Sequence, residues 1–420
     1  MINDTRKRIV ILIGVIILLN VFEVFYTHGK SLFSLFFYDE TDTFMDFLNS
    51  IGHVVQGNLY ENKALYPPLT YVILLLFSMI IPQSDLDKYF HATRVLDARA
   101  YQGPMLATMI FIIICVLMVA FCIFVYKKGS NREKYSYVIL SMFSIPILYA
   151  LERGNMVILA FIFAFIFFIW KDSDNRILRE LAFISLAVSA GIKIYPAIFG
   201  IMLIAEKRYK EAIRTVIYGI ILFLTPFMLF GGLNQVITLV QNIFSYSGEV
   251  GASTAKILSY DFGFLISIMG NKVGLSADTA TMIALLYKVI FIVTSIFGLL
   301  ILEDNSKKVL LLTVLMIGLP GMSFTYMLIF LLIPFIMILN KKVLGYVDII
   351  TCLLLIFVMY PIPFINNIGD HGRKYFRTQA YSTYGKISEI CFFVISILLI
   401  LYVVKSVVMK LNKRRIIEKA

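Results

Sequence analysis

Long apolar stretches, separated by short polar or charged segments, follow one another along the whole chain. A membrane-spanning helix needs roughly 20 apolar residues, so this pattern predicts about twelve transmembrane helices. The expected spans are residues 9–26, 104–126, 135–150, 156–170, 181–193, 196–205, 214–230, 279–302, 309–320, 325–339, 347–362 and 388–404. A shorter apolar stretch, residues 69–82, is expected to be a re-entrant or partial helix, with a thirteenth crossing as the alternative.

The composition carries more apolar surface than a water-soluble core could bury. Hydrophobic residues make up 60% of the 420 residues, and charged residues only 15%. Because no soluble block separates the apolar stretches, residues 1–420 are expected to form one all-α, polytopic membrane domain. The sequence contains no internal repeat, P-loop or dinucleotide-binding motif.

The net charge of +12 comes largely from short Lys and Arg runs beside apolar stretches. Such runs mark the cytoplasmic ends of membrane helices, so they indicate topology and not nucleic-acid binding. The runs are Arg6-Lys7-Arg8, Lys127-Lys128, Lys207-Arg208 with Lys210, Lys307-Lys308, Lys341-Lys342 and Lys413-Arg414-Arg415. Both termini are therefore expected to be cytoplasmic, with outer segments at 27–68, 83–103, 231–278 and 363–387.

The first outer segment contains a second periodic pattern. Asp42, Asp46, Asn49 and His53 fall at offsets of 4, 7 and 11, which places them on one stripe of a helix over residues 42–55. Apolar residues occupy the remaining side. The pattern predicts an amphipathic interfacial helix that lies flat on the membrane, with its apolar side in lipid and its carboxylates lifted.

Within this helix Asp46 is the expected general base. It lies between Met45 and Phe47, close to the lipid boundary, where partial desolvation favours the neutral carboxyl and raises its basicity. Asp39 and Asp42, with Glu40, either solvate the helix or form a secondary acidic, acceptor-facing group. His53 is expected to cap or pack the helix or to join the acceptor-facing group of Asp39 and Asp42. It is not expected to bind metal, because no second His lies at metal-ligand spacing.

Three motifs in consistent order resemble those of glycosyltransferase family 87, the polyprenol-phosphate-mannose-dependent enzymes of the GT-C type. The first is Asp46-Phe47 with Gly57-Asn58-Leu59-Tyr60 and Tyr66-Pro67-Pro68-Leu69, which resembles that family's first outer loop. Arg153-Gly154-Asn155 resembles its Gly-Gln/Asn outer corner, and Lys193-Ile194-Tyr195-Pro196 its Lys-x-Tyr-Pro helix break. The likeness covers roughly residues 1–230.

The resemblance implies an inverting transferase with an extracytoplasmic site, a lipid-linked sugar donor, and Asp46 as base. The donor would be a polyprenyl phosphate carrying mannose or another hexose or pentose. The acceptor would be a glycolipid or cell-wall glycan, and the location a plasma membrane. Many relatives carry a His near the position of residues 318–326 that is expected to contact the donor phosphate, and this chain has none there.

Cations are expected to hold the departing phosphate. Arg153 is costly to place near lipid unless it meets an anion, either the phosphate or a carboxylate such as Glu152. Lys193 either binds phosphate or extends to the outer surface. The cluster Arg373, Lys374 and Arg377, beside His371, either binds phosphate or a lipid headgroup or is a solvated loop.

Two other classes of protein remain open alternatives. A secondary transporter would explain broken helices near buried cations, but it predicts an internal repeat. A lipid-linked polysaccharide ligase or polymerase would use a diphosphate-linked donor. No cofactor or metal is expected, although oxygens of Asp39, Glu40 and Asp42 are an alternative divalent-ion site.

Overall fold

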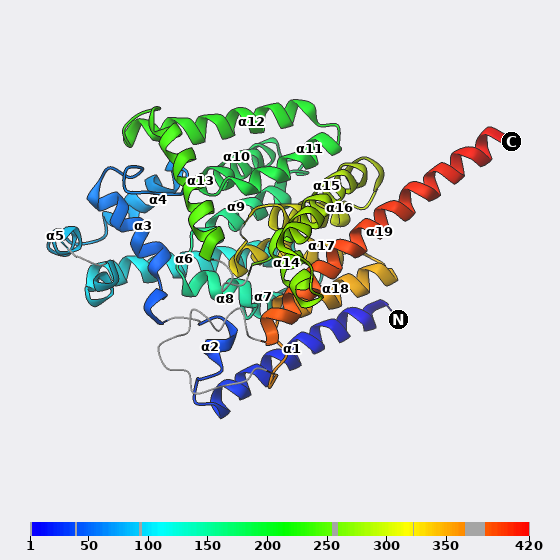
Figure 1. Cartoon of the computed structure of the whole chain (residues 1–420), viewed down its shortest axis with the longest axis horizontal. Helices are drawn as coiled ribbons and strands as arrows, with labels where there is room; N and C mark the ends of the chain where they lie inside the picture. The colour runs from blue at the N-terminus through cyan, green and yellow to red at the C-terminus, as the bar shows by residue number, and fades with distance from the viewer. Residues whose placement is uncertain are drawn as a thin grey trace.

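The computed structural model describes residues 2–37, 40–91, 95–253, 259–321, 323–365 and 383–419. Within these ranges every regular element is an α-helix or a 3-10 helix, which confirms the all-α prediction. The helices form an elongated assembly, from which the C-terminal part of the last helix projects (Figure 1).

Helices form in each of the twelve ranges where the sequence predicts a span. They are α1 (Ile2–Tyr26), α6 (Gln102–Tyr126), α7 (Asn131–Met142) with α8 (Ile145–Glu152), α9 (Val157–Trp170), α10 (Arg176–Ile192), η3 (Tyr195–Gly200) with α11 (Ile201–Ala205), α12 (Tyr209–Leu224) with η4 (Thr225–Leu229), α15 (Ala277–Ile301), α16 (Asn305–Gly318), η6 (Thr325–Leu331) with α17 (Leu332–Leu339), α18 (Tyr346–Met359) and α19 (Thr383–Lys419). Among the described residues, 5 helices are long and apolar enough to cross a membrane, or 6 with the bent α7–α8 pair. The count of about twelve stays a prediction.

The remaining helices are shorter and mostly flank the predicted spans. They are α2 (Leu32–Leu35), η1 (Glu40–Asp42), α3 (Met45–Gln56), α4 (Pro68–Ser78), α5 (Gln83–His91), η2 (Val95–Ala100), α13 (Gln235–Ser253) and α14 (Phe262–Lys272). The stretch expected to be a partial helix is α4, with 11 residues. Pro68 takes the first position of α4, where its missing N–H costs nothing.

Helices α9 and α10 pack as an antiparallel pair, and their ends define two opposite ends of the assembly. Their packing includes a buried hydrogen bond of 2.6 Å from Ser189 Oγ to the Ala160 carbonyl. The start of α9 and the end of α10 therefore lie together, next to Arg153 and Lys193. We call this the carboxylate end, because Asp46 joins it, and we call the opposite end, where Lys171 follows α9, the basic end.

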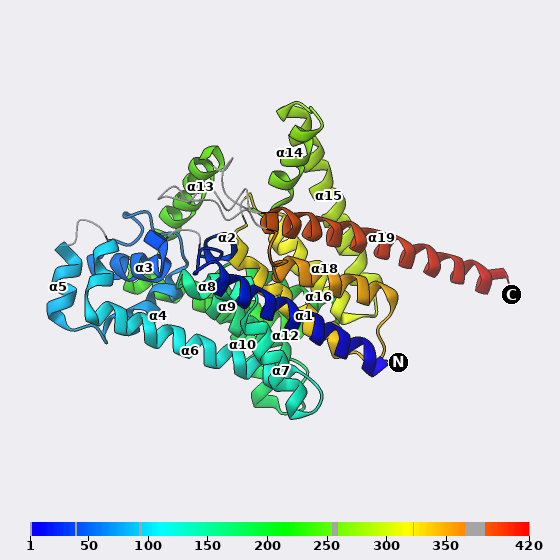
Figure 2. The ribbon, with the colours of Figure 1, turned by 90° about the horizontal axis from the view of Figure 1, so that it is seen from below.

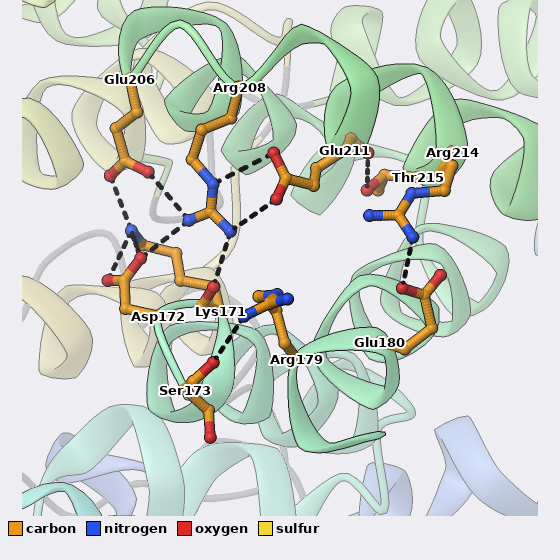
Figure 3. Close-up of polar contacts among 10 residues, drawn as sticks. All are labelled: Lys171, Asp172, Ser173, Arg179, Glu180, Glu206, Arg208, Glu211, Arg214 and Thr215. Atoms are coloured by element: carbon orange, nitrogen blue, oxygen red, sulfur yellow. Dashed lines mark hydrogen bonds and ion pairs between the residues drawn. The ribbon is translucent and has the colours of Figure 1, made fainter. Parts of the chain in front are cut away.

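At the basic end a closed ionic network joins the α9–α10 turn to the α11–α12 turn (Figure 3). Lys171 contacts Glu206 at 2.6 Å and Asp172 at 2.8 Å, and Arg208 contacts Asp172 at 2.8 Å. Arg208 also donates to the Lys171 carbonyl at 2.8 Å. These contacts hold the helix ends that lie opposite Arg153 and Lys193.

The expected orientation of the amphipathic helix is wrong. The helix exists as α3, but Phe47, Leu48 and Ile51 on its apolar side are fully buried in the protein core, not placed in lipid. Figures 1 and 2 show α3 beside α4, with which it makes extensive contact. The amphipathic pattern is the same for lipid and for a protein neighbour, so periodicity alone did not separate them.

Candidate active site

The corner between α8 and α9 positions the first part of the site. Gly154 has φ +62°, a left-handed conformation that favours glycine. A Cβ at this position would lie 2.9 Å from the Cβ of Phe47, so the corner also needs a residue without a side chain. Glycine lets α3 pack directly against the turn that carries Arg153 and Asn155.

Backbone hydrogen bonds hold the start of α3 on this corner. Phe44 N–H donates to the Glu152 carbonyl at 2.8 Å, and Asp46 N–H donates to the Arg153 carbonyl at 3.1 Å. The Thr43 hydroxyl donates to Glu152 Oε1 at 2.8 Å. The backbone of Asp46 is therefore placed by the corner itself. Sequence reasoning missed Thr43, and it considered Glu152 only as a partner of Arg153, not as the acceptor for Thr43.

The Asp46 carboxylate is hydrogen-bonded on both oxygens. Arg153 Nη2 lies 2.7 Å from Oδ1 and Nε lies 3.3 Å from Oδ2, a bidentate pair. Asn155 Nδ2 donates to Oδ2 at 2.6 Å. Asp42, in η1 and not in α3, contacts Arg153 Nη1 at 2.6 Å. The surroundings of Asp46 are therefore a guanidinium and an amide instead of the expected lipid boundary.

Both carboxylates act on the protonation of Arg153. Burial of the guanidinium disfavours its charged form, but the nearby Asp46 and Asp42 outweigh burial and raise the pKa of Arg153. Arg153 is thus a permanent cation with all three guanidinium nitrogens engaged by carboxylates.

The break after α10 brings Lys193 to the same end. The Thr70 hydroxyl of α4 donates to the Ile192 carbonyl at 2.8 Å, and Leu69 packs where a Cβ of Gly191 would lie. These contacts fix the end of α10 against the start of α4, directly after Pro67-Pro68.

Lys193 packs on an aromatic ring and does not extend to the surface. Its Nζ lies 3.7 Å from the centroid of the Tyr66 ring, and the residue is 8% exposed. Among the described residues no carboxylate lies within 4.0 Å of Nζ. Lys193 is therefore a buried amine that makes no ion pair with the described part of the chain.

Tyrosines surround these charged groups. Burial and then the charge of Asp46 raise the pKa of Tyr66, so its hydroxyl stays neutral. The Tyr195 hydroxyl is buried and has no hydrogen-bond partner among the residues that the structure describes. Tyr326 stacks on Tyr149 with ring centroids 5.9 Å apart. Sequence reasoning missed Tyr149 and Tyr326. Tyr326 lies in the segment 318–326, where many relatives are expected to carry a His and this chain has none.

The structure thus brings together Asp42, Asp46, Arg153, Asn155, Lys193, Tyr66 and Pro67-Pro68, with Tyr195-Pro196 directly after the break. His53 lies in α3, and its buried Nδ1 has no hydrogen-bond partner within the described ranges. Asp39, Arg373, Lys374 and Arg377 lie outside the described residues. In the part of the chain that the structure describes, no group of three or more His, Cys, Asp or Glu side chains could hold a metal ion.

Comparison with protein families adds the identity of the chain. The family model described as glycosyltransferase family 87 matches residues 64–322, which is more than half of the chain. The match covers the Tyr66 motif, the Arg153 corner and the Lys193 break but begins after Asp46. No curated protein and no solved structure matches the chain. The chain belongs to glycosyltransferase family 87 and is a membrane glycosyltransferase.

Proposed function

We propose that this protein is an inverting transferase that moves a sugar from a polyprenyl phosphate donor to an acceptor hydroxyl. The sugar would be mannose or another hexose or pentose, and the acceptor a glycolipid or cell-wall glycan. The observation that supports this best is the meeting of a positioned carboxylate, Asp46, with the buried amine of Lys193, which no carboxylate among the described residues approaches within 4.0 Å, at one end of the helices. A base and a phosphate-binding cation are the two groups that this transfer requires.

Asp46 is the proposed base, and its hydrogen bonds indicate which oxygen acts. A carboxylate has about four lone-pair sites. Oδ2 accepts from Arg153 and Asn155, whereas Oδ1 accepts from Arg153 alone. Oδ1 is therefore the atom that would take the acceptor proton. The acceptor oxygen attacks the anomeric carbon from the face opposite the phosphate, the glycosidic carbon–oxygen bond to phosphate breaks, and the configuration inverts.

Lys193 is the proposed partner of the departing phosphate. The leaving group is already a stable anion, so it needs a cation more than a general acid. Burial strengthens the attraction between this amine and a phosphate oxygen, since little water screens the charges. Contact between Arg153 and the phosphate would require exchange of its bond to Asp42. We therefore assign Arg153 first to holding Asp46, and the Arg373, Lys374 and Arg377 cluster to the phosphate or a lipid headgroup.

We place this chemistry in a GT-C-type arrangement of about twelve crossings in the plasma membrane. The carboxylate end would face away from the cytoplasm, because the Lys207-Arg208 run lies at the other end, where Arg208 pairs with Asp172. The reaction as written needs no cofactor. A transporter is disfavoured by membership of a glycosyltransferase family, whereas a ligase or polymerase differs in using a diphosphate donor.

Reconstitution tests the proposal. Purified protein in liposomes, given labelled polyprenyl phosphate-hexoses and a lipid extract as acceptor, should form a glycosidic bond with inverted configuration. The Asp46→Asn variant should lose about 10²- to 10⁴-fold in kcat, the range of a positioned base. Asn49→Asp, on the exposed part of the same helix, is the matched control and should keep full activity. Full activity of Asp46→Asn would refute the assignment of Asp46 as the base. Sugar transfer only from diphosphate-linked donors would refute the assignment of a polyprenyl phosphate donor.

A further inference from the structure

Two side chains at the basic end carry buried hydrogen-bond donors for which the described part of the chain supplies no acceptor. They are Nε and Nη2 of Arg6, on α1, and the hydroxyl of Tyr137, on α7. Tyr137 is only 4% exposed. Leaving a buried donor unpaired costs about 1–3 kcal/mol, and more for a charged group, so unpaired donors in one place indicate a missing acceptor.

The two side chains lie close to a third donor, Lys127, directly after α6. Helix α1 packs on α7, and Lys127 Nζ lies 4.6 Å from the centroid of the Tyr137 ring. Burial lowers the pKa of Lys127 to about 8; Glu133 opposes this shift and the positive charge of Arg6 adds to it. The two cations are therefore near neighbours, and Lys127 is held by the Lys128 carbonyl at 2.8 Å and by Asn340 Oδ1 at 3.2 Å.

The unpaired atoms of Arg6 have a specific geometry. Nε and Nη2 form one edge of the planar guanidinium, and this edge donates two parallel hydrogen bonds to two oxygens of a carboxylate or phosphate. The Glu133 carboxylate, whose charge raises the pKa of Lys127, already accepts from Ser130 N–H at 2.9 Å in a helix cap. The donors of Arg6 thus match an anion that the described chain does not supply.

We propose that Arg6, Tyr137 and Lys127 bind the phosphate of an anionic membrane phospholipid. The two non-ester oxygens of the phosphate would accept from the edge of Arg6, and one of them would also accept from the Tyr137 hydroxyl beside Lys127. A lipid is favoured over a soluble anion because α1 lies at the periphery of the helices. Only 22% of the residues in its most apolar stretch are buried inside the protein, and Ile11 and Leu18 are 63% and 70% exposed. Basic sites between helices at a membrane boundary suit lipid headgroups. The site is separate from the proposed transfer chemistry.

Lipid-dependent stability of the full-length protein tests this site. The melting temperature would be measured in a neutral detergent during titration with phosphatidylglycerol, phosphatidylcholine or inorganic phosphate. Phosphatidylglycerol should stabilise the wild type, and its half-saturating concentration should rise roughly tenfold or more in Arg6→Gln, as expected for a lost charge-assisted pair. Lys7→Gln, an exposed neighbour with the same charge change, should leave it unchanged.

Tyr137→Phe keeps the ring under Lys127 and removes only the hydroxyl, so it tests the site even if Arg6→Gln does not fold. It should weaken the effect of phosphatidylglycerol severalfold, and native mass spectrometry should show fewer retained anionic lipids. If Lys7→Gln and Arg6→Gln lost stabilisation by phosphatidylglycerol equally, the effect would come from general surface charge, and the proposed site would be overturned. Stabilisation by inorganic phosphate but not by phosphatidylglycerol would overturn the lipid as ligand.

Discussion

Asn155 donates from Nδ2 to Oδ2 of Asp46 over 2.6 Å, and through this bond the beginning of α9 orients a carboxylate that lies 109 residues away in the chain. The Oδ1 atom of Asn155 accepts in turn from the backbone N–H of Val157 at 2.8 Å, so the amide cannot rotate freely. Asn155 is a positioning residue for the proposed base, because it touches Asp46 and not the reacting atoms.

Replacing Asn155 by Ala should therefore impair catalysis more than substrate binding. We expect kcat to fall about 10- to 100-fold with a small change in KM, because a misplaced catalytic group can cost 10²-fold. The measurement is initial-rate kinetics of sugar transfer. Asn155→Gln keeps an amide and should recover part of the rate, whereas a change confined to KM would contradict a role through Asp46.

Gly154→Ala should destabilise the protein. The new Cβ would meet Phe47 at 2.9 Å in a left-handed backbone conformation, which together should cost about 1–3 kcal/mol. The measurement is thermal unfolding in detergent. Gly219→Ala is the matched control, because Gly219 lies inside α12 with nothing within 4 Å of the added Cβ, and it should be neutral or slightly stabilising. Equal melting temperatures for the two variants would contradict the close packing at the corner.

Donor binding should depend on the amine of Lys193. Lys193→Gln should raise the KM for the donor about tenfold or more, because a hydrogen bond to a charged group contributes about 1.5–3 kcal/mol. The measurement is initial-rate kinetics at several donor concentrations. Lys210→Gln, at an exposed position of the opposite end, is the control and should leave this KM unchanged. An unchanged KM in Lys193→Gln would exclude Lys193 as the donor cation.

Arg208→Gln should reduce stability without impairing chemistry. It removes contacts with Asp172, Glu206 and Glu211 and leaves these acidic groups near one another (Figure 3). We expect a loss of about 1–3 kcal/mol with kcat per folded molecule unchanged, because the network lies at the basic end. Lys210→Gln, at an exposed position, is the control. A large fall in kcat at unchanged stability would mean that the network takes part in the reaction.

Cysteine labelling can establish which side of the membrane each end faces. Asn49→Cys on α3 and Lys210→Cys on α12 are exposed positions at opposite ends, whereas Cys115, Cys122 and Cys352 are buried. In intact cells a membrane-impermeant maleimide should label Asn49→Cys and should spare Lys210→Cys until the cells are opened. The reverse labelling would place the carboxylate end in the cytoplasm, and the unsubstituted protein controls for the half-buried Cys391.

The sequence by itself determined where helices form and which residues could carry chemistry. Apolar stretches, prolines and charged runs act over a few residues, so the twelve helical ranges, Asp46, Arg153 and Lys193 were all readable from them. Only the tertiary structure decided that Arg153 pairs with Asp46 across 107 residues, that Lys193 rests on Tyr66, and that α3 faces protein and not lipid. The physical reason is that an apolar helix face packs equally well against lipid or against another helix, and that a charged side chain can pair with any opposite charge within reach. Which residues become neighbours is therefore set by the packing of the whole chain.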